Sequence, residues 1–229
     1  IIQNYGADAA RWFMLSDSPP EKDINWSDSG IKGSWKICQK IWNLVSENKT
    51  NLIFKELNNK DQFSNTAVQL LMLVNMNLDT ITKSIEKFQM NVAIAKIYEI
   101  VNAVSKFKIK EKNDNIAIGK SLKILIRTIE PMIPHLAEEC WSMLYQDTSI
   151  IHEPWPEVDK TFLEVTDVTI VVQINGKRRG EILVKKGITE GEVFNEMKKI
   201  KNISDALTGK NILKSIYVPD RIINIVLSQ

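Results

Sequence analysis

Apolar residues recur every three or four positions through the first two thirds of the chain, which is the period of amphipathic helices. Tyr5-Gly6 breaks the chain before the first of them. The spacing predicts five helices, over 7–16, 28–45, 66–87, 91–104 and 115–145. Ser27 or Asp28 is the expected cap of the second helix, and Asn91 that of the fourth. The fifth helix is expected to break at Pro131 and Pro134.

Each predicted helix carries one apolar stripe, as helices do when they bury one side. In the second helix the stripe predicted to be buried is Ile31, Trp35, Cys38, Trp42 and Val45. In the fourth helix the predicted inner face is Val92, Ala95, Ile97, Val101 and Val104. We also expect Trp26 and Trp35 to be core residues. Long single-stripe helices joined by short loops pack as an antiparallel bundle.

After Phe162 the pattern changes to β-branched runs that are typical of strands. Strands are predicted over 168–174 and 181–184, joined by the hairpin signal Asn175-Gly176, and over 211–218 and 222–227. Between the pairs, Thr189 and Glu192 form a capping-box pattern that predicts one helix. The order ββαββ predicts a small α+β domain with a helix on a mostly antiparallel sheet.

The fold class predicted is therefore multidomain, an all-α antiparallel helical bundle followed by a small α+β domain. The composition supports this division, because all six tryptophans precede residue 156 and five of the nine glycines lie beyond residue 175. We expect a bundle over 1–157, a linker over 158–166 and a second domain over 167–229.

Charge follows the same division. The whole chain has a net charge of +2, which by itself indicates no nucleic acid or membrane partner. Residues 166–229 hold 11 Lys and Arg against 7 Asp and Glu, whereas residues 1–165 hold 19 against 21. The basic excess therefore belongs to the second domain.

The sequence indicates no catalytic site of its own. Phosphate-binding glycine loops and nucleophile elbows are both missing from it. His135, Glu138 and Glu139 share a helix face, but a zinc motif of the H-x-x-E-H kind needs a second His where Glu139 stands, so we expect no metal site. Cys38 and Cys140 fall in apolar patterns and are expected to be reduced core residues. With no signal segment and no membrane span, we expect a cytoplasmic protein.

Several segments resemble one region of class I aminoacyl-tRNA synthetases, the segment after their Lys-Met-Ser-Lys-Ser loop and the helical anticodon-binding domain that follows. In the predicted bundle, this resemblance is carried by the segments 5–15, 18–27, 88–95, 130–141 and 152–157. The segment 130–141 resembles the final helix of the anticodon-binding domain, and the segment 152–157 resembles its exit strand. In the tail, the segments 172–180, 216–219 and 222–226 resemble the C-terminal domain of bacterial-type leucyl-tRNA synthetases.

This resemblance implies the C-terminal part of an enzyme that joins leucine to its tRNA. ATP and magnesium are implied for that parent enzyme and no cofactor for this part, which would lack the catalytic and editing sites. The implied partners are the tRNA for leucine and the missing catalytic domain, with no membrane, and we expect a monomer. In that family the bundle lies along the inner side of the tRNA and the small domain reaches the tRNA elbow.

The predicted tRNA-binding residues are basic, because Lys and Arg neutralise phosphates. In the second domain they are Lys177, Arg178, Arg179, Lys185, Lys186, Lys210 and Lys214, and in the bundle they are Arg11, Lys36 and Lys40, which could contact either the tRNA stem or the catalytic domain. Two alternatives stay open: the same region of an isoleucine or valine ligase, and a non-catalytic module that binds protein.

Overall fold

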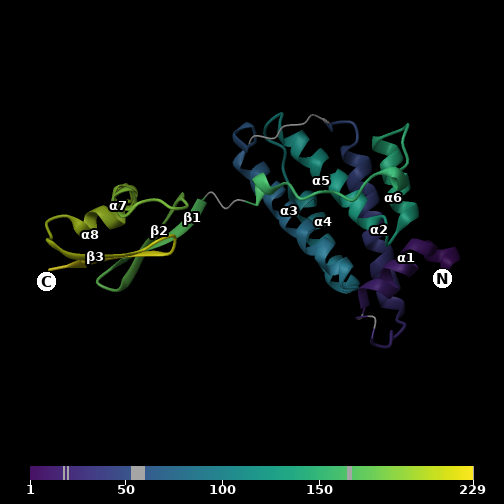
Figure 1. Cartoon of the computed structure of the whole chain (residues 1–229), viewed down its shortest axis with the longest axis horizontal. Helices are drawn as coiled ribbons and strands as arrows, with labels where there is room; N and C mark the ends of the chain where they lie inside the picture. The colour runs from purple at the N-terminus through teal and green to yellow at the C-terminus, as the bar shows by residue number, and fades with distance from the viewer. Residues whose placement is uncertain (18, 20, 53–59, 164–166, 229) are drawn as a thin grey trace. The chain divides into compact units, whose positions relative to one another are not determined.

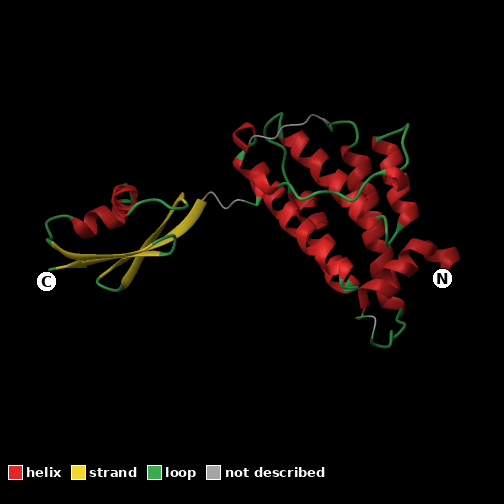
Figure 2. Cartoon of the chain, viewed as in Figure 1, coloured by secondary structure: helices red, strands yellow, loops and turns green. Residues whose placement is uncertain are grey.

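The computed structural model describes residues 1–17, 19, 21–52, 60–163 and 167–228 of the chain (Figure 1). Ser18 and Pro20, part of one motif above, lie outside these residues, as do residues 53–59 between the second and third predicted helices. The backbone divides into two compact units, Ile1–Leu163 and Glu164–Gln229. The first is helical and the second contains the sheet (Figure 2), so the predicted fold class is confirmed.

The helical unit contains α1 (Ile2–Asp17), α2 (Asp28–Asn48), α3 (Asn65–Glu86), α4 (Met90–Lys106), α5 (Asp114–Ile129) and α6 (Pro134–Leu144), with short 3-10 turns η1 (Lys60–Gln62), η2 (Ile150–His152) and η3 (Lys160–Phe162). Its core is largely aliphatic, with Trp12 and Trp141 as its largest fully buried side chains. The predicted break between α5 and α6 is confirmed, and Pro134 occupies the first turn of α6, where its missing N–H leaves no bond unmade.

The first helix differs from its prediction at Gly6. The helix α1 begins before Gly6, at Ile2, and bends there, because Gly6 has φ 82° and ψ 161° inside the helical span. Only glycine adopts this conformation without strain. Gly6 therefore kinks α1 and does not precede it.

The prediction for α2 is wrong for its tryptophans. Trp35 and Trp42 are 37% and 39% exposed, while Ile37 and Ile41 are buried on the neighbouring stripe. The helix has apolar residues on more than half of its circumference, so spacing alone could not choose between the two stripes. Trp26 is also not a core residue: it is 47% exposed and rests edge-on against Phe13.

Helix α4 shows a similar rotation. It begins at Met90 after Gln89, so Asn91 lies in its first turn and is not the cap. Val92 and Ala95 are exposed, whereas Ala93 and Ile94 are buried. The remaining predicted inner residues Ile97, Val101 and Val104 are buried.

The segment after α6 runs back along α3. Trp155 donates from Nε1 to the Thr82 hydroxyl at 2.9 Å, and the Asp159 N–H donates to Asn75 Oδ1 at 2.8 Å. Phe162 is buried beside Phe63. The helical unit thus continues through Phe162, beyond the expected end at 157. The predicted exit strand over 152–157 is instead the end of η2 followed by irregular backbone.

The second unit is a four-stranded sheet with two helices on one face (Figure 2). Its elements are β1 (Asp167–Ile174), β2 (Lys177–Lys185), α7 (Glu190–Lys198), α8 (Lys201–Leu207), β3 (Ile212–Val218) and β4 (Ile222–Leu227). The strand order is β2-β1-β4-β3, with a parallel central pair between two antiparallel pairs. The sequence predicted one helix where there are two, since α8 has only seven residues and too short a pattern to detect.

The capping box that starts α7 is confirmed. The Thr189 N–H donates to the Glu192 carboxylate at 3.0 Å. Hydrogen bonds from the Thr189 side chain and backbone lower the pKa of Glu192.

Within the residues that the structure describes, no helix combines the length and the hydropathy needed to cross a membrane.

Candidate nucleic-acid interface

Three of the predicted basic residues, Lys177, Arg178 and Arg179, begin β2 directly after the turn that joins it to β1. Asn175 and Gly176 have φ of 49° and 76°, the left-handed pair that a tight hairpin turn requires. The turn is also fastened to β4: Asn175 Oδ1 accepts from the Leu227 N–H at 2.8 Å, and Asn224 Oδ1 accepts from the Gly176 N–H at 3.1 Å. These bonds fix the position from which Lys177, Arg178 and Arg179 project.

The start of β2, where Lys177, Arg178 and Arg179 lie, contains a β-bulge. Arg178 lies opposite Gln173 and Gly180 opposite Val172, so Arg179 has no partner residue on β1. Lys177, Arg178 and Arg179 are all exposed. Arg178 pairs with Glu181 at 2.6 Å, but both side chains are exposed, and such pairs contribute little stability. The guanidinium can therefore exchange this partner for a phosphate.

The sheet topology brings five of the seven predicted basic residues of this unit to one end. Strands β2 and β3 begin where β1 and β4 finish, and the Ser228 N–H donates to the Asn211 carbonyl at 2.9 Å at that end. Lys177, Arg178 and Arg179 lie there on one edge strand, and Lys210 and Lys214 at the start of the other. We call these five residues the basic end of the sheet.

Lys185 and Lys186 lie at the opposite end. A nine-residue strand separates Lys177 from Lys185, which at about 3.3 Å per residue is roughly 25 Å. The turn that follows is tied to the β3–β4 turn, because the Gly187 N–H donates to Asp220 Oδ1 at 2.8 Å. Lys185 and Lys186 are exposed but are not part of the basic end.

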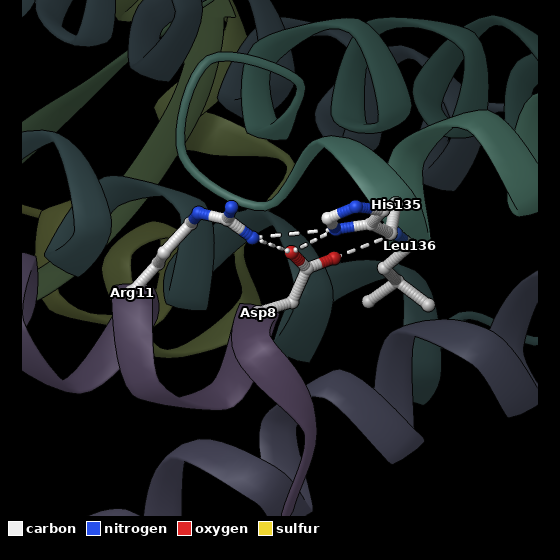
Figure 3. Close-up of polar contacts among 4 residues, drawn as sticks. All are labelled: Asp8, Arg11, His135 and Leu136. Carbon is white, nitrogen blue, oxygen red and sulfur yellow. Dashed lines mark hydrogen bonds and ion pairs between the residues drawn. The ribbon is translucent and has the colours of Figure 1, made fainter. Parts of the chain in front are cut away.

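In the helical unit, Arg11 belongs to a network between α1 and α6 (Figure 3). The Asp8 carboxylate accepts from Arg11 Nη1 at 2.8 Å, from the Leu136 N–H at 2.7 Å, and contacts His135 Nδ1 at 2.9 Å. Helix α6 has no cap from its own N-cap residue Ile133, so Asp8 supplies the acceptor that the first turn lacks. Arg11 is exposed and in contact with this carboxylate.

We expect Asp8→Ala to destabilise the helical unit by about 1–2 kcal/mol, because α6 would lose its capping acceptor and a charge near its positive end. All six tryptophans lie in this unit, so the midpoint of urea unfolding followed by Trp fluorescence measures the effect. Asp8→Asn keeps an acceptor without the charge, so its unfolding midpoint should lie between those of the unchanged chain and Asp8→Ala. An unchanged midpoint for Asp8→Ala would contradict the capping role.

Lys36 and Lys40 lie one turn apart on α2 and line one polar hollow of about 370 Å³, together with Gln39, Asn43 and Ser105. Lys40 Nζ donates to Asn102 Oδ1 on α4 at 2.8 Å. The structure therefore brings Lys36 and Lys40 together, whereas Arg11 lies apart from them in the Asp8 network.

In the described parts of the chain, no three His, Cys, Asp or Glu side chains are grouped so that they could hold a metal ion. Cys140 is buried and Cys38 half-buried, and neither forms a disulfide. Burial raises the pKa of each thiol to about 12, so both are neutral at physiological pH.

Sequence reasoning missed Asp8, Asn175 and Asn224 as the residues that hold the basic side chains in place. Asn175 was recognised only as a turn residue. The bonds made by Asp8 and Asn224 reach across 128 and 48 positions of sequence. Within single helices and strands there is no local signal for such partners.

A family model described as the anticodon-binding domain of tRNA ligase matches residues 67–194. This is more than half of the chain, and the chain belongs to that family. Among its relatives, the leucine–tRNA ligase of Parvibaculum lavamentivorans is 38% identical over 99% of this chain and 26% of its own length. That of Maricaulis maris is 39% identical over 99% of this chain and 26% of its own length. The resemblance to leucyl-tRNA synthetases is thus confirmed, and the chain spans about a quarter of these relatives.

Two solved structures share the fold. The ternary complex of Agrobacterium radiobacter K84 agnB2 LeuRS with tRNA and LeuAMS has a TM-score of 0.70 and 25% identity, covering 100% of this chain and 29% of that one. The free-state Mycobacterium tuberculosis methionyl-tRNA synthetase has a TM-score of 0.50 and 13% identity, covering 82% of this chain and 38% of that one. The second likeness shows the fold alone.

Proposed function

We propose that this chain is the tRNA-binding C-terminal part of a leucine–tRNA ligase. The observation that carries the proposal is the similarity to leucine–tRNA ligases over 99% of the chain. The solved structure with a TM-score of 0.70 is described as a complex with tRNA, which supports tRNA as the partner. Ligation of leucine, with ATP and magnesium, would take place in the rest of the longer protein, which we expect to be a cytoplasmic monomer.

The basic end of the sheet is the part we assign to the tRNA backbone. Its five side chains are exposed on the two edge strands at one end of a small sheet, and phosphate contacts of this kind position a nucleic acid without reading its bases. Lys36 and Lys40, together with Arg11, are proposed as weaker contacts of the helical unit with the tRNA stem or the catalytic domain.

Binding of leucine tRNA to the 229-residue chain, measured by filter binding over a series of salt concentrations, tests the proposal. We expect binding that weakens as salt rises, because each neutralised phosphate releases about 0.7–0.9 counterions. We also expect no pyrophosphate exchange with leucine and ATP. Salt-independent binding, or none, would favour the protein-binding alternative, and equal affinity for isoleucine or valine tRNA would favour the other ligases.

Two double variants that remove the same charge can distinguish the contributions of the two ends of the sheet to tRNA binding. Lys210→Ala with Lys214→Ala should weaken tRNA binding and lower the salt slope by about 1.5, as expected for two phosphate contacts. Lys185→Ala with Lys186→Ala removes two charges from the far end and should change both quantities less. Equal losses from both pairs would show that net charge, and not the basic end, governs binding.

A further inference from the structure

A groove follows α3 and α4 on the surface of the helical unit, where the two helices lie side by side (Figure 1). It consists of two hollows of about 410 and 450 Å³ that share Gln69 and Leu73 in their walls. Along α3 the lining extends from Thr66 to Thr80, fourteen positions apart, which at about 1.5 Å per residue is roughly 21 Å. None of the predicted tRNA-binding residues belongs to its described lining.

The half of the groove near the end of α4 is basic. Lys106, Lys108 and Lys110 line this half and are exposed, and its described lining contains no Asp or Glu. Complementary charges across an interface raise the rate of association and exclude partners of the wrong charge. This half of the groove therefore favours an acidic ligand.

The other half is more apolar and contains a buried hydrogen-bond donor that has no acceptor. Met72 and Met76 line it, and Met76 is 56% exposed. Asn77, also in the lining, is only 5% exposed, and its Nδ2 has no hydrogen-bond partner among the described residues. Buried amide groups are almost always paired, because an unpaired one is unfavourable. A ligand carbonyl could complete this amide, since the flexible Met side chains beside it can move to admit one.

The groove favours a polypeptide over RNA. Single-stranded RNA binds in grooves largely by stacking its bases on aromatic side chains, and Phe107 is the one aromatic residue in the described lining. Phe107 is partly buried and packs against two of the core clusters, so its ring is not free to stack on a base. In the half around Asn77, Lys96 is paired with Glu99 at 2.7 Å, so a phosphate there would also meet a carboxylate.

We propose that this groove binds an acidic, extended segment of a partner protein. The carboxylates of the segment would contact Lys106, Lys108 and Lys110, its apolar side chains would pack beside Met76, and one of its carbonyls would accept from Asn77 Nδ2. An extended segment has free carbonyls, whereas a helix uses most of its own. At about 3.3 Å per residue, roughly six or seven residues fill the groove. The proposal is independent of tRNA binding, which is assigned to other residues.

Selection of peptides from a random library displayed on phage, with the 229-residue chain as the target, tests the proposal. The selected peptides should combine carboxylates with apolar residues, and fluorescence anisotropy of one labelled peptide then gives its affinity. Lys106→Glu with Lys108→Glu should weaken binding by about ten-fold or more, because like charges then face each other. Lys22→Glu with Lys32→Glu makes the same change of charge at exposed positions outside the groove and should alter the affinity little.

Asn77→Leu separates a ligand contact from a structural role. It should weaken peptide binding several-fold without lowering the urea midpoint of the helical unit, because Asn77 Nδ2 has no partner to lose in the described structure. Asn75→Leu is the matched control: Asn75 is also buried, but it donates to the Leu71 carbonyl at 2.8 Å and accepts from the Asp159 N–H. This control should lower the midpoint and leave the peptide affinity of the folded chain unchanged.

A selection without acidic, apolar peptides, or equal affinity of the selected peptide for all four variants, would overturn the proposal. So would a loss of tRNA affinity on Lys106→Glu with Lys108→Glu as large as the loss from the basic end, which would make RNA the occupant. Self-association of the chain that this variant abolishes would make a second copy the occupant. The longer ligase should bind the peptide as well as the 229-residue chain does, and failure to bind would show that the rest of that protein covers the groove.

Discussion

Replacing Lys177, Arg178 and Arg179 together by Ala is expected to abolish most of the affinity of the chain for tRNA at physiological salt. Each Lys or Arg on a phosphate contributes about 0.7–0.9 to the slope of log affinity against log salt, so losing three contacts should lower the slope by about 2–3. The measurement is filter binding of leucine tRNA between low and moderate salt. The three side chains are consecutive at the start of β2, next to a turn that Asn175 and Asn224 fasten to β4, so their contacts should be lost together.

The control must remove the same charge from another part of the surface. Lys106 is the last residue of α4 and Lys108 and Lys112 follow it; all three are exposed and lie in the helical unit. Their triple replacement by Ala leaves the same net charge and should lower the slope less. The hairpin variant itself should stay folded, because the Arg178–Glu181 pair that it removes is exposed. A folded hairpin variant with an unchanged slope would contradict phosphate binding by this turn.

The basic end shows how far a sequence can predict a site. Asn175-Gly176 indicated the hairpin, and the β-branched runs indicated all four strands, because these signals are local. The separation of Lys185 from Lys210 could not be predicted, because it depends on β4 pairing in parallel with β1, between strands about 50 residues apart. Non-local pairing decides which basic residues share an end.

The helical unit shows the opposite limit. Helix positions were predicted to within a few residues, and Ile31 and Val45 of the predicted α2 stripe are buried, but Trp35 and Trp42 of that stripe are not. Trp35 and Trp42 fit an apolar helical stripe, yet Ile37 and Ile41 of the neighbouring stripe belong to the core that α2 shares with α4 and α6. A sequence pattern measures hydrophobicity, whereas burial also depends on the shape of the neighbouring helices.

The second large effect is expected from Asp114→Ala, a change in stability. Asp114 is fully buried, and its carboxylate accepts hydrogen bonds from the Ser64 hydroxyl at 2.6 Å and from the N–H groups of Lys110 and Glu111 at 2.8 and 3.0 Å. Ser64 in turn caps α3, accepting from the Ala67 N–H at 3.1 Å. One carboxylate thus joins the start of α3 to the turn before α5.

Removing this fully buried carboxylate leaves the part-buried Ser64 hydroxyl and two backbone N–H groups without their acceptor, and we expect a loss of about 2 kcal/mol or more. Trp fluorescence in a urea titration measures the unfolding of the helical unit. Asp79→Ala is the matched control: its carboxylate pairs with Lys83 at 2.6 Å but is 41% exposed, so its loss should cost less than about 1 kcal/mol. Equal effects of the two variants would show that the network around Asp114 contributes no more than a surface pair.

The pH dependence gives this prediction a sign. Burial by itself would raise the pKa of Asp114, but the hydrogen bonds from Ser64 and from the backbone of Lys110 and Glu111 outweigh it and lower the pKa. The unfolded chain then binds the proton more readily than the folded one, so the contribution is complete above the ordinary pKa of Asp and is lost as the pH falls toward the folded pKa. The stability difference between the natural chain and Asp114→Asn should therefore narrow as the pH falls from about 5 toward 3. A difference that stays constant over this range would mean that the ionised carboxylate is not what stabilises the start of α5.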